Sequence, residues 1–376
     1  MDTNELTDYM GSFADRLVSN VLRSSIKDPK EMAFLIKFGI SVKKANRLRI
    51  EYETKGLHIP AFLISSITTS CNLFCKGCYA RANGICGKPQ KVEMGIDNWR
   101  SVFSQAEGLG ISFNILAGGE PLMRKDILEA AGKMKNTVFP IFTNGTMIDD
   151  TYLRMFKKYR NLIPIFSLEG NRESTDERRG AGTYDTVIEK MVKLRDNILF
   201  YGVSVTLMEG KTDEVTSEEF ISMLHELGCR ILFFIEFIPV KPESTSMAPT
   251  DVTRRSMEVR LGTLRSKYDD MMFMSFPGDE KFLGGCLGAG RGFFHINPYG
   301  DAEACPASPY SDVNLINSSL EDVLRSKLFS ELRKEGLLEG DHSGGCILLE
   351  KEDKVRELAN INRTVWLFRS ILSGIR

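Results

Sequence analysis

Between Ala61 and Val240 the chain alternates short apolar runs with longer amphipathic stretches, and this alternation restricts the fold more than any other feature. The apolar runs are rich in β-branched and aromatic residues, which is typical of strands buried on both faces. The stretches between them place apolar residues at helical spacing. Strands that alternate with helices build parallel sheets from repeated βα units. The sequence therefore predicts an α/β fold whose functional residues lie at the carboxyl ends of the strands.

Six strands and five helices are predicted in this region. The strands are expected at 62–68, 112–116, 137–142, 163–168, 200–207 and 231–238, and the helices near 96–108, 125–135, 149–159, 183–197 and 216–227. Six βα units suit a partial barrel, and a doubly wound open sheet is the alternative that the periodicity leaves open.

The first predicted strand ends in a loop that carries three thiols, Cys71, Cys75 and Cys78, at the spacing C-x3-C-x2-C. Thiolates are soft ligands that suit iron–sulfur clusters. Such a short loop can wrap one face of a cubane and leave one iron open to an exogenous ligand. A zinc knuckle or a set of buried free thiols is the alternative, although zinc sites favour four ligands in paired C-x2-C units or with histidine.

Polar motifs follow the second and third predicted strands. The second strand is followed by Gly118-Gly119-Glu120-Pro121, where two glycines permit close backbone approach and the carboxylate suits an ammonium group. A plain glycine turn with a helix-capping glutamate is the alternative. The third strand is followed by Thr143-Asn144-Gly145, a turn whose side chains can form local hydrogen bonds.

Further polar residues stand on the later strands and the segment between them. Ser167 and Glu169 close the fourth strand. Arg179 precedes the helix expected at 183–197, and its guanidinium is fitted to grip a carboxylate through two parallel hydrogen bonds. A solvated charge run at a helix start is the alternative for Arg179. Ser204 and Glu236 interrupt the apolar fifth and sixth strands, facing either into the barrel or outward.

The cysteine loop, with Tyr79 directly after it, and the Gly-Gly-Glu-Pro motif resemble the radical S-adenosylmethionine (radical SAM) superfamily. The resemblance implies a partial (β/α)6 barrel and a [4Fe–4S] cluster on Cys71, Cys75 and Cys78. This cluster would cleave SAM reductively to a 5′-deoxyadenosyl radical, which abstracts hydrogen from the substrate. The resemblance also implies SAM contacts from these residues: Tyr79, Gly118, Gly119, Glu120, Pro121, Thr143, Asn144, Ser167, Glu169, Arg179 and Ser204. No acid–base catalytic pair stands out.

Three more thiols, Cys286, Cys305 and Cys346, lie near glycines in the C-terminal third, where a β-hairpin is expected to begin at Phe293. The segment from Gly300 to Cys305 fits the G-x4-C pattern of the SPASM/Twitch C-terminal domain, which this region resembles. The resemblance implies one auxiliary cluster on the three thiols, because the dense cysteine group of a full SPASM domain is missing. Three unrelated thiols are the alternative. The fourth ligand is left open among Cys229, Cys86, His295, Asp341, His342 and the substrate.

Four segments are expected along the chain: an N-terminal helical segment at 1–57, a radical SAM core at 58–243, a Twitch-like domain at 244–350 and a C-terminal helix at 351–376. Apolar residues from Leu6 to Leu22 follow a helical spacing, and a second helix is expected at 31–37 with a continuation over 41–54. This N-terminal segment either caps the barrel or docks a partner or peptide.

Composition limits the setting and the partners. The polar N-terminus and the lack of any apolar run near the ~20 residues of a membrane span predict a cytoplasmic protein without membrane contact. Eight cysteines without a secretion signal favour metal binding over disulfides, and a net charge of −1 gives no sign of a nucleic-acid-binding face.

The resemblance to these families implies an oxidoreductase or maturase. It implies a peptide or protein substrate that is oxidised or crosslinked, and a reductase such as flavodoxin or ferredoxin as the electron donor. The alternative is dehydrogenation or rearrangement of a small metabolite or cofactor precursor. A non-enzymatic iron–sulfur electron carrier is a remote alternative, because a carrier has no use for the Gly-Gly-Glu-Pro motif.

Overall fold

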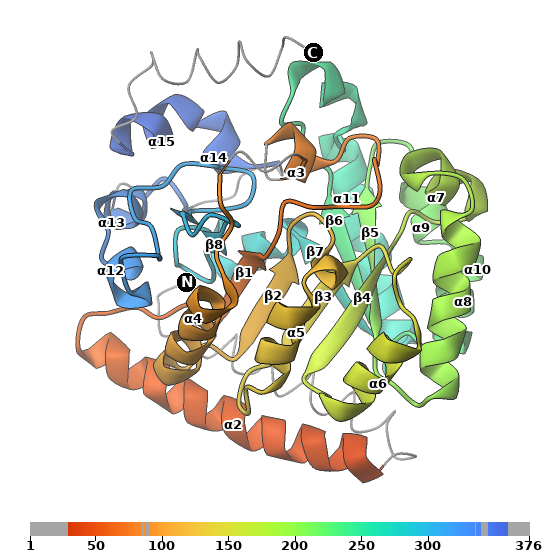
Figure 1. The fold of residues 1–376 in the computed structure, drawn as a ribbon. Coiled ribbons are helices and arrows are strands. Elements are labelled where there is room, and N and C mark those ends of the chain that lie inside the picture. Colours follow the sequence, from red (N-terminus) through yellow and green to blue (C-terminus); the bar gives the residue numbers. More distant parts are fainter. Residues whose placement is uncertain (1–28, 84–85, 88–90, 335, 340–344, 360–376) are drawn as a thin grey trace.

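One nine-stranded sheet organises the protein, as seen in a computed structural model that describes residues 29–83, 86–87, 91–334, 336–339 and 345–359 (Figure 1). The strand order is β7-β6-β5-β4-β3-β2-β1-β8-β9. Every neighbouring pair from β7 to β8 is parallel, and the β8–β9 pair is antiparallel. The strands are β1 Phe62–Ser66, β2 Phe113–Ala117, β3 Phe139–Thr143, β4 Leu162–Leu168, β5 Gly202–Leu207, β6 Ile231–Glu236, β7 Met272–Phe276, β8 His295–Ile296 and β9 Ala302–Glu303.

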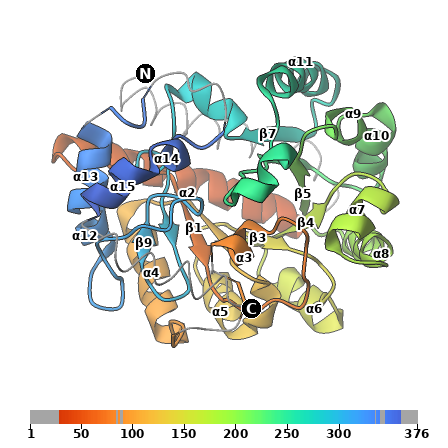
Figure 2. The same ribbon diagram turned by 90° about the horizontal axis from the view of Figure 1, so that it is seen from above.

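Helices cover the outer face of this curled sheet, as the view from above shows (Figure 2). The helices are α2 Pro29–Thr54, α3 Tyr79–Ala82, α4 Ile96–Leu109, α5 Lys125–Gly132, α6 Asp150–Lys158, α7 Arg172–Arg179, α8 Thr183–Asp196, α9 Thr212–Val215, α10 Glu218–Glu226, α11 Asp251–Lys267, α12 Leu320–Leu324, α13 Lys327–Lys334, α14 Ile347–Glu350 and α15 Glu352–Leu358. Three short 3-10 helices lie at Pro121–Met123, Pro242–Met247 and Gly278–Leu283.

The predicted alternation of strands and helices is confirmed, and the sheet is the curled partial barrel of the first alternative rather than a doubly wound sheet. All six predicted strands and all five predicted helices are present, with ends that differ by a few residues. Strand β7 was not predicted. Its sequence Met-Phe-Met-Ser-Phe is short and rich in methionine, so its pattern carries little strand signal, yet it pairs in parallel with β6.

Helix α2 closes the barrel at the amino ends of the strands (Figure 1). Phe38 and Val42 lie one helical turn apart and are buried against Ile163, Ile231 and other side chains of the barrel interior. The helix begins at Pro29, a position where the missing N–H of proline costs nothing. The predicted helix through 31–37 and its continuation over 41–54 are therefore confirmed, in the arrangement of a cap. The helix predicted from Leu6 to Leu22 lies outside the described residues.

The C-terminal part continues the barrel sheet. The predicted hairpin is confirmed as β8 and β9, and β8 pairs in parallel with β1. Helices α12 to α15 lie beside this hairpin, and α14 and α15 lie near the carboxyl ends of the strands (Figure 1). Because both β7 and β8 join the barrel sheet, the boundary between residues 243 and 244 stays a prediction.

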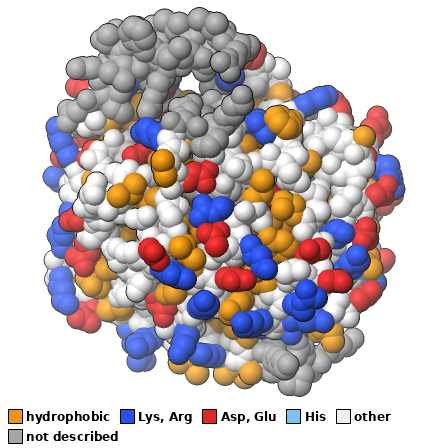
Figure 3. Space-filling view, viewed as in Figure 1, with side chains coloured by type: hydrophobic (Ala, Val, Ile, Leu, Met, Phe, Trp, Pro, Cys, Tyr) orange, Lys and Arg blue, Asp and Glu red, His pale blue; other side chains and the backbone are white. Residues whose placement is uncertain are grey.

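The visible surface mixes charges of both signs. Lys and Arg side chains alternate with Asp and Glu on the face that carries α4, α5 and α6 (Figure 3), in keeping with the net charge of −1. Among the described residues, no helix combines the length and apolarity that crossing a bilayer requires.

Candidate active site at the carboxyl ends of the strands

The cysteine loop leaves β1 at the end of the barrel opposite α2 and leads into α3 (Figure 1). Cys71, Cys75 and Cys78 are all partly exposed. The backbone N–H of Gly119 donates to Thr68 O at 2.8 Å and that of Glu120 donates to Ser70 O at 2.7 Å. The end of β2 therefore holds the base of the loop.

Both glycines of the Gly-Gly-Glu-Pro motif are required by this contact. A Cβ on Gly118 would stand 2.5 Å from Thr68 O, and one on Gly119 would stand 2.1 Å from Ser70 O. Gly118 also has a φ of +125°, which side-chain-bearing residues rarely adopt. The motif thus forms a cradle in which the backbone of the cysteine loop lies directly on the backbone after β2.

Glu120 is buried, and protein donors satisfy its carboxylate. The carboxylate accepts hydrogen bonds from Leu122 N at 3.0 Å, Thr143 Oγ1 at 2.7 Å and Asn144 N at 2.8 Å. Burial raises the pKa of Glu120 to about 7, although these hydrogen bonds act in the opposite direction. Glu120 therefore joins the ends of β2 and β3. Any contact with an ammonium group would come in addition to these bonds.

Asn144 connects the end of β3 to the cysteine loop. Its side-chain amide donates to Asn72 Oδ1 at 2.9 Å, and Asn72 in turn donates to Thr146 Oγ1 at 2.8 Å. Asn72 stands next to Cys71, so the predicted Thr143-Asn144-Gly145 turn steadies the first cysteine of the loop.

Two arginines share the buried carboxylate of Glu169 at the end of β4. Arg178 forms an ion pair with Glu169, and Arg179 Nε donates to the same Oε1 at 2.8 Å. Sequence reasoning singled out Arg179 for the carboxylate of SAM but missed Arg178, although the two stand next to each other. The backbone N–H of Lys76 donates to Arg178 O at 2.8 Å, so this pair also reaches the cysteine loop.

The charge of Arg179 acts on the thiols of the loop. Burial raises the pKa of Cys75, and the Arg179 guanidinium opposes that shift. For Cys71, a hydrogen bond from the Cys86 thiol lowers the pKa to about 6, with smaller contributions from nearby groups that include Arg179. Positive charge beside cysteines favours the thiolate, which is the form that binds metal.

Ser167 and Ser204 lie opposite each other on β4 and β5. Ser167 follows Ile165 by two residues on β4, and Ser204 follows Gly202 by two residues on β5, so each serine points to the same face as that residue. This face points into the barrel, because Ile165 belongs to the interior cluster closed by α2. The structure therefore brings these two predicted site residues together inside the barrel.

The second group of thiols assembles from three distant segments. Cys305 forms a hydrogen bond with Cys346, and Cys286 lies close enough for the charges of the three thiols to interact. The N–H of Gly288 donates to Cys286 Sγ at 3.4 Å, and a Cβ at Gly288 would stand 3.4 Å from that sulfur. Sulfurs that accept backbone N–H donors beside glycine are suited to cluster ligation.

The two thiol groups are neighbours. Asn83, just after α3, donates its side-chain amide to Pro306 O at 2.9 Å, next to Cys305. Tyr79 is 38% exposed as a residue. Burial of its hydroxyl, followed by the charges of Cys78 and Cys305, raises its pKa. The hydroxyl of Tyr79 is therefore close enough to interact with cysteines of both groups.

The candidates for a fourth ligand of the second group have other contacts. The ring of His295 bonds Ser66 Oγ at 2.8 Å through Nε2 and Glu303 Oε2 at 2.6 Å through Nδ1. Cys229 is fully buried and donates to Ile231 O at 3.2 Å, at the far end of β6, and Cys86 packs against Cys71. Asp341 and His342 lie outside the described residues.

The donor chemistry of both groups fits iron–sulfur clusters. Each offers three thiols with glycines that admit close backbone approach. Within the described ranges, no three Cys, His, Asp or Glu side chains converge as ligands of one metal ion do. The cysteines of a cubane bind different irons and therefore stand farther apart than the ligands of a single ion.

Comparison with known proteins identifies the barrel. Residues 65–232, which include the cysteine loop and the motifs after β2 to β4, match the radical SAM superfamily. The chain therefore carries a radical SAM domain. Its cofactors are a [4Fe–4S] cluster and SAM, as throughout this family.

Several characterised proteins are similar to this radical SAM enzyme. The mycofactocin maturase MftC of Mycolicibacterium smegmatis is 25% identical over 326 residues, which cover 81% of this chain and 79% of the relative. The AdoMet-dependent heme synthase of Methanosarcina barkeri is 23% identical, covering 75% and 87%. Streptococcus suis SuiB, solved with its precursor peptide SuiA, shares the fold with a TM-score of 0.65 at 17% identity, covering 87% of this chain and 79% of that one.

Glu93 and Arg254 hold parts of the site and were missed by sequence reasoning. Glu93 accepts hydrogen bonds from both N and Oγ1 of Thr69, each at 2.6 Å, just before the cysteine loop. Arg254 contacts the end of β6, where it pairs with Glu236. Both stand in ordinary polar stretches, so their neighbours in sequence carry no signal of their role.

Proposed function

We propose that this radical SAM enzyme oxidises or crosslinks a side chain of a ribosomally made peptide, with an auxiliary cluster on Cys286, Cys305 and Cys346. The observation that carries the proposal is the assembly of these thiols beside the cysteine loop, where Asn83 bonds Pro306 O at 2.9 Å. The likeness to a mycofactocin maturase and to a fold solved with a precursor peptide supports a peptide substrate.

Each residue group has a separate task in this proposal. Cys71, Cys75 and Cys78 would hold the first cluster, and the cradle after β2 keeps their loop in place. The polar residues of the β3, β4 and β5 ends, Asn144, Ser167, Glu169, Arg179 and Ser204, would orient SAM. With SAM bound, a reduced cluster on these three cysteines would supply the radical chemistry that takes a hydrogen atom from the substrate. The auxiliary cluster would supply an acceptor for the electron that leaves as the substrate also loses a proton.

Iron analysis tests the ligand assignment. Anaerobically prepared wild type should contain about eight irons, and replacing all three cysteines of either group by alanine should lower this to about four, on the expectation of a four-iron cubane at each site. Cys229→Ala is the matched control, since this buried thiol lies far from both groups. A wild type with only about four irons, unchanged in the Cys286/Cys305/Cys346 variant, contradicts the auxiliary cluster.

A turnover assay tests the substrate. The reduced enzyme is incubated with SAM and a short peptide encoded beside it, supplied with electrons by flavodoxin or ferredoxin. The expected product has lost a pair of hydrogens by mass spectrometry. The second candidate is a small molecule or cofactor precursor, which the likeness to a heme synthase favours. Turnover of such a compound and not of the peptide would establish that candidate instead.

A further inference from the structure

Glu236, the last residue of β6, lies on the outer face of the sheet rather than inside the barrel. Glu236 lies on the same face of β6 as Phe234 and Leu232, two and four residues before it, which pack in the core beneath the helices, whereas Phe233 belongs to the barrel interior. The Glu236 side chain is only 5% exposed. This carboxylate is therefore held by other protein groups and is not directed at the centre of the barrel.

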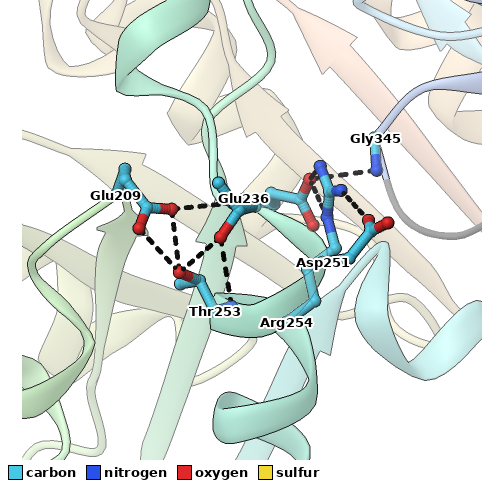
Figure 4. A network of polar contacts seen from close by, with 7 residues as sticks. Glu209, Glu236, Asp251, Thr253, Arg254 and Gly345 are labelled. Atoms are coloured by element: carbon cyan, nitrogen blue, oxygen red, sulfur yellow. Dashed lines mark hydrogen bonds and ion pairs between the residues drawn. The ribbon is translucent and has the colours of Figure 1, made fainter.

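Glu236 joins the barrel to the loop that carries Cys346 (Figure 4). Its Oε1 accepts from Arg254 Nη2 at 2.6 Å and from Arg254 Nε at 2.9 Å. The same oxygen accepts from the backbone N–H of Gly345 at 3.0 Å. Gly345 directly precedes Cys346, so an ion pair at the end of β6 fixes the peptide next to a candidate cluster ligand.

Arg254 lies in the first turn of helix α11, which holds it next to Glu236. Thr250 caps the helix by accepting from Thr253 N, and Glu209, just after β5, accepts from Thr250 N at 2.7 Å. Glu209 also accepts from Thr253 Oγ1 at 2.9 Å (Figure 4). The first turn of α11 is thereby fastened to the barrel. Asp251 Oδ1 accepts from Arg254 Nη1 at 3.0 Å and orients the guanidinium further.

Gly345 suits this contact through its backbone. Its φ is +76°, and a Cβ there would stand 3.6 Å from Arg254 Nη2 and 3.5 Å from Glu350 Oε1. Glycine adopts this conformation without strain. The turn directs the N–H of Gly345 to Glu236 and leaves Cys346 beside Cys305.

We propose that Glu236 and Arg254 are positioning residues of the auxiliary cluster, which hold its Cys346 ligand and set its reduction potential through opposed charges. The inference rests on the proposed cluster at Cys286, Cys305 and Cys346. Net charge and hydrogen bonding near the sulfurs set the potential of an iron–sulfur cluster. A carboxylate nearby favours the oxidised cluster and a guanidinium the reduced one, and in the intact pair the two effects oppose each other.

Two variants separate the charges. Glu236→Gln keeps an oxygen for the N–H of Gly345 but removes one negative charge, while Arg254 keeps its positive charge and its ion pair with Asp251. Arg254→Met leaves the carboxylate unbalanced. In redox titrations followed by EPR, we expect the potential of the auxiliary cluster to rise in Glu236→Gln and to fall in Arg254→Met. In Arg254→Lys the potential should lie closer to that of wild type than in Arg254→Met, because lysine keeps the positive charge.

Loss of iron to a chelator gives a second readout. We expect Arg254→Met to lower the affinity for auxiliary iron about 10-fold, the scale on which loss of a partner of a metal ligand weakens metal binding, and therefore to lose this iron faster than wild type. Arg260→Met is the matched control, since Arg260 lies on the same helix and pairs with Asp213, away from Cys346. Neither readout should change in this control.

The outcomes separate the two proposals. If wild type holds both clusters but the two charge variants shift the potential in the same direction or not at all, the positioning role is overturned and the proposed function stands. If wild type lacks the auxiliary cluster, the proposed function fails and this inference fails with it.

Discussion

Gly119→Ala adds only one methyl group, but we expect it to disturb the cysteine loop strongly. The added Cβ would stand 2.1 Å from Ser70 O, 2.6 Å from Ser70 C and 3.0 Å from Thr69 O. These are main-chain atoms of the strand-to-loop connection that leads directly to Cys71, so no flexible side chain can move aside. Gly119 does not have a positive φ, and the steric contact is therefore the effect under test.

The magnitude follows from two opposed contributions. Overpacking costs about 1–3 kcal/mol, and an obstacle made of main chain belongs in the upper part of that range. Alanine also lowers the conformational entropy of the unfolded chain, which stabilises the folded state by about 0.4–1 kcal/mol. The net loss in the free energy of unfolding should be about 2 kcal/mol. Because the strain falls on the loop that holds Cys71, the variant should also lose iron from the first cluster.

The assay combines anaerobic denaturant unfolding with iron content and EPR. Gly108→Ala, in the last turn of α4, is the matched control because a Cβ there meets no atom within 4 Å. Alanine in this helix should raise stability by about 1 kcal/mol and leave iron unchanged. If Gly119→Ala behaves like Gly108→Ala in stability and iron content, the contact between the motif and the cysteine loop is not the reason for the glycine.

Two further predictions concern buried carboxylates, and they join the iron analysis and the potential shifts described above. Glu169→Gln removes the charged partner of both Arg178 and Arg179 and should lower the free energy of unfolding by about 3–5 kcal/mol, because buried guanidinium groups lose their counter-charge. The control is Glu51→Gln, in the exposed pair with Lys55, which should leave stability in equilibrium unfolding unchanged. Equal effects of the two variants would contradict the buried ion pairs. The pKa of Glu120 is raised to about 7 in the folded protein, against an ordinary value of 4.5. The folded state then binds more protons than the unfolded state in this window, so the contribution of Glu120 to stability falls as pH rises from about 4.5 to about 7. Unfolding across this range should show a shallower fall in Glu120→Gln than in wild type, and parallel curves would refute the shifted pKa.

The sequence anticipated most of the barrel because its signals are local. Strands and helices reveal themselves through periodic apolar residues, and the motifs after β1, β2 and β3 lie at strand ends that any parallel sheet brings to one edge. Strand β7 escaped because a short methionine-rich run has no clear period. The joining of β8 to β1 escaped because no local pattern records which strand a hairpin pairs with.

By itself, the sequence determined which candidate ligands the chain offers, namely three thiols at fixed spacing and three more thiols beside glycines, and it placed a pair of glycines after a predicted strand. Only the tertiary structure decided which of them meet. Cys305 and Cys346 come together although they stand 41 positions apart in the chain, and Glu236 turns away from the barrel to pair with Arg254. Side-chain direction at a strand end depends on register, and contacts between distant segments depend on packing. Neither is written in the spacing of residues along the chain.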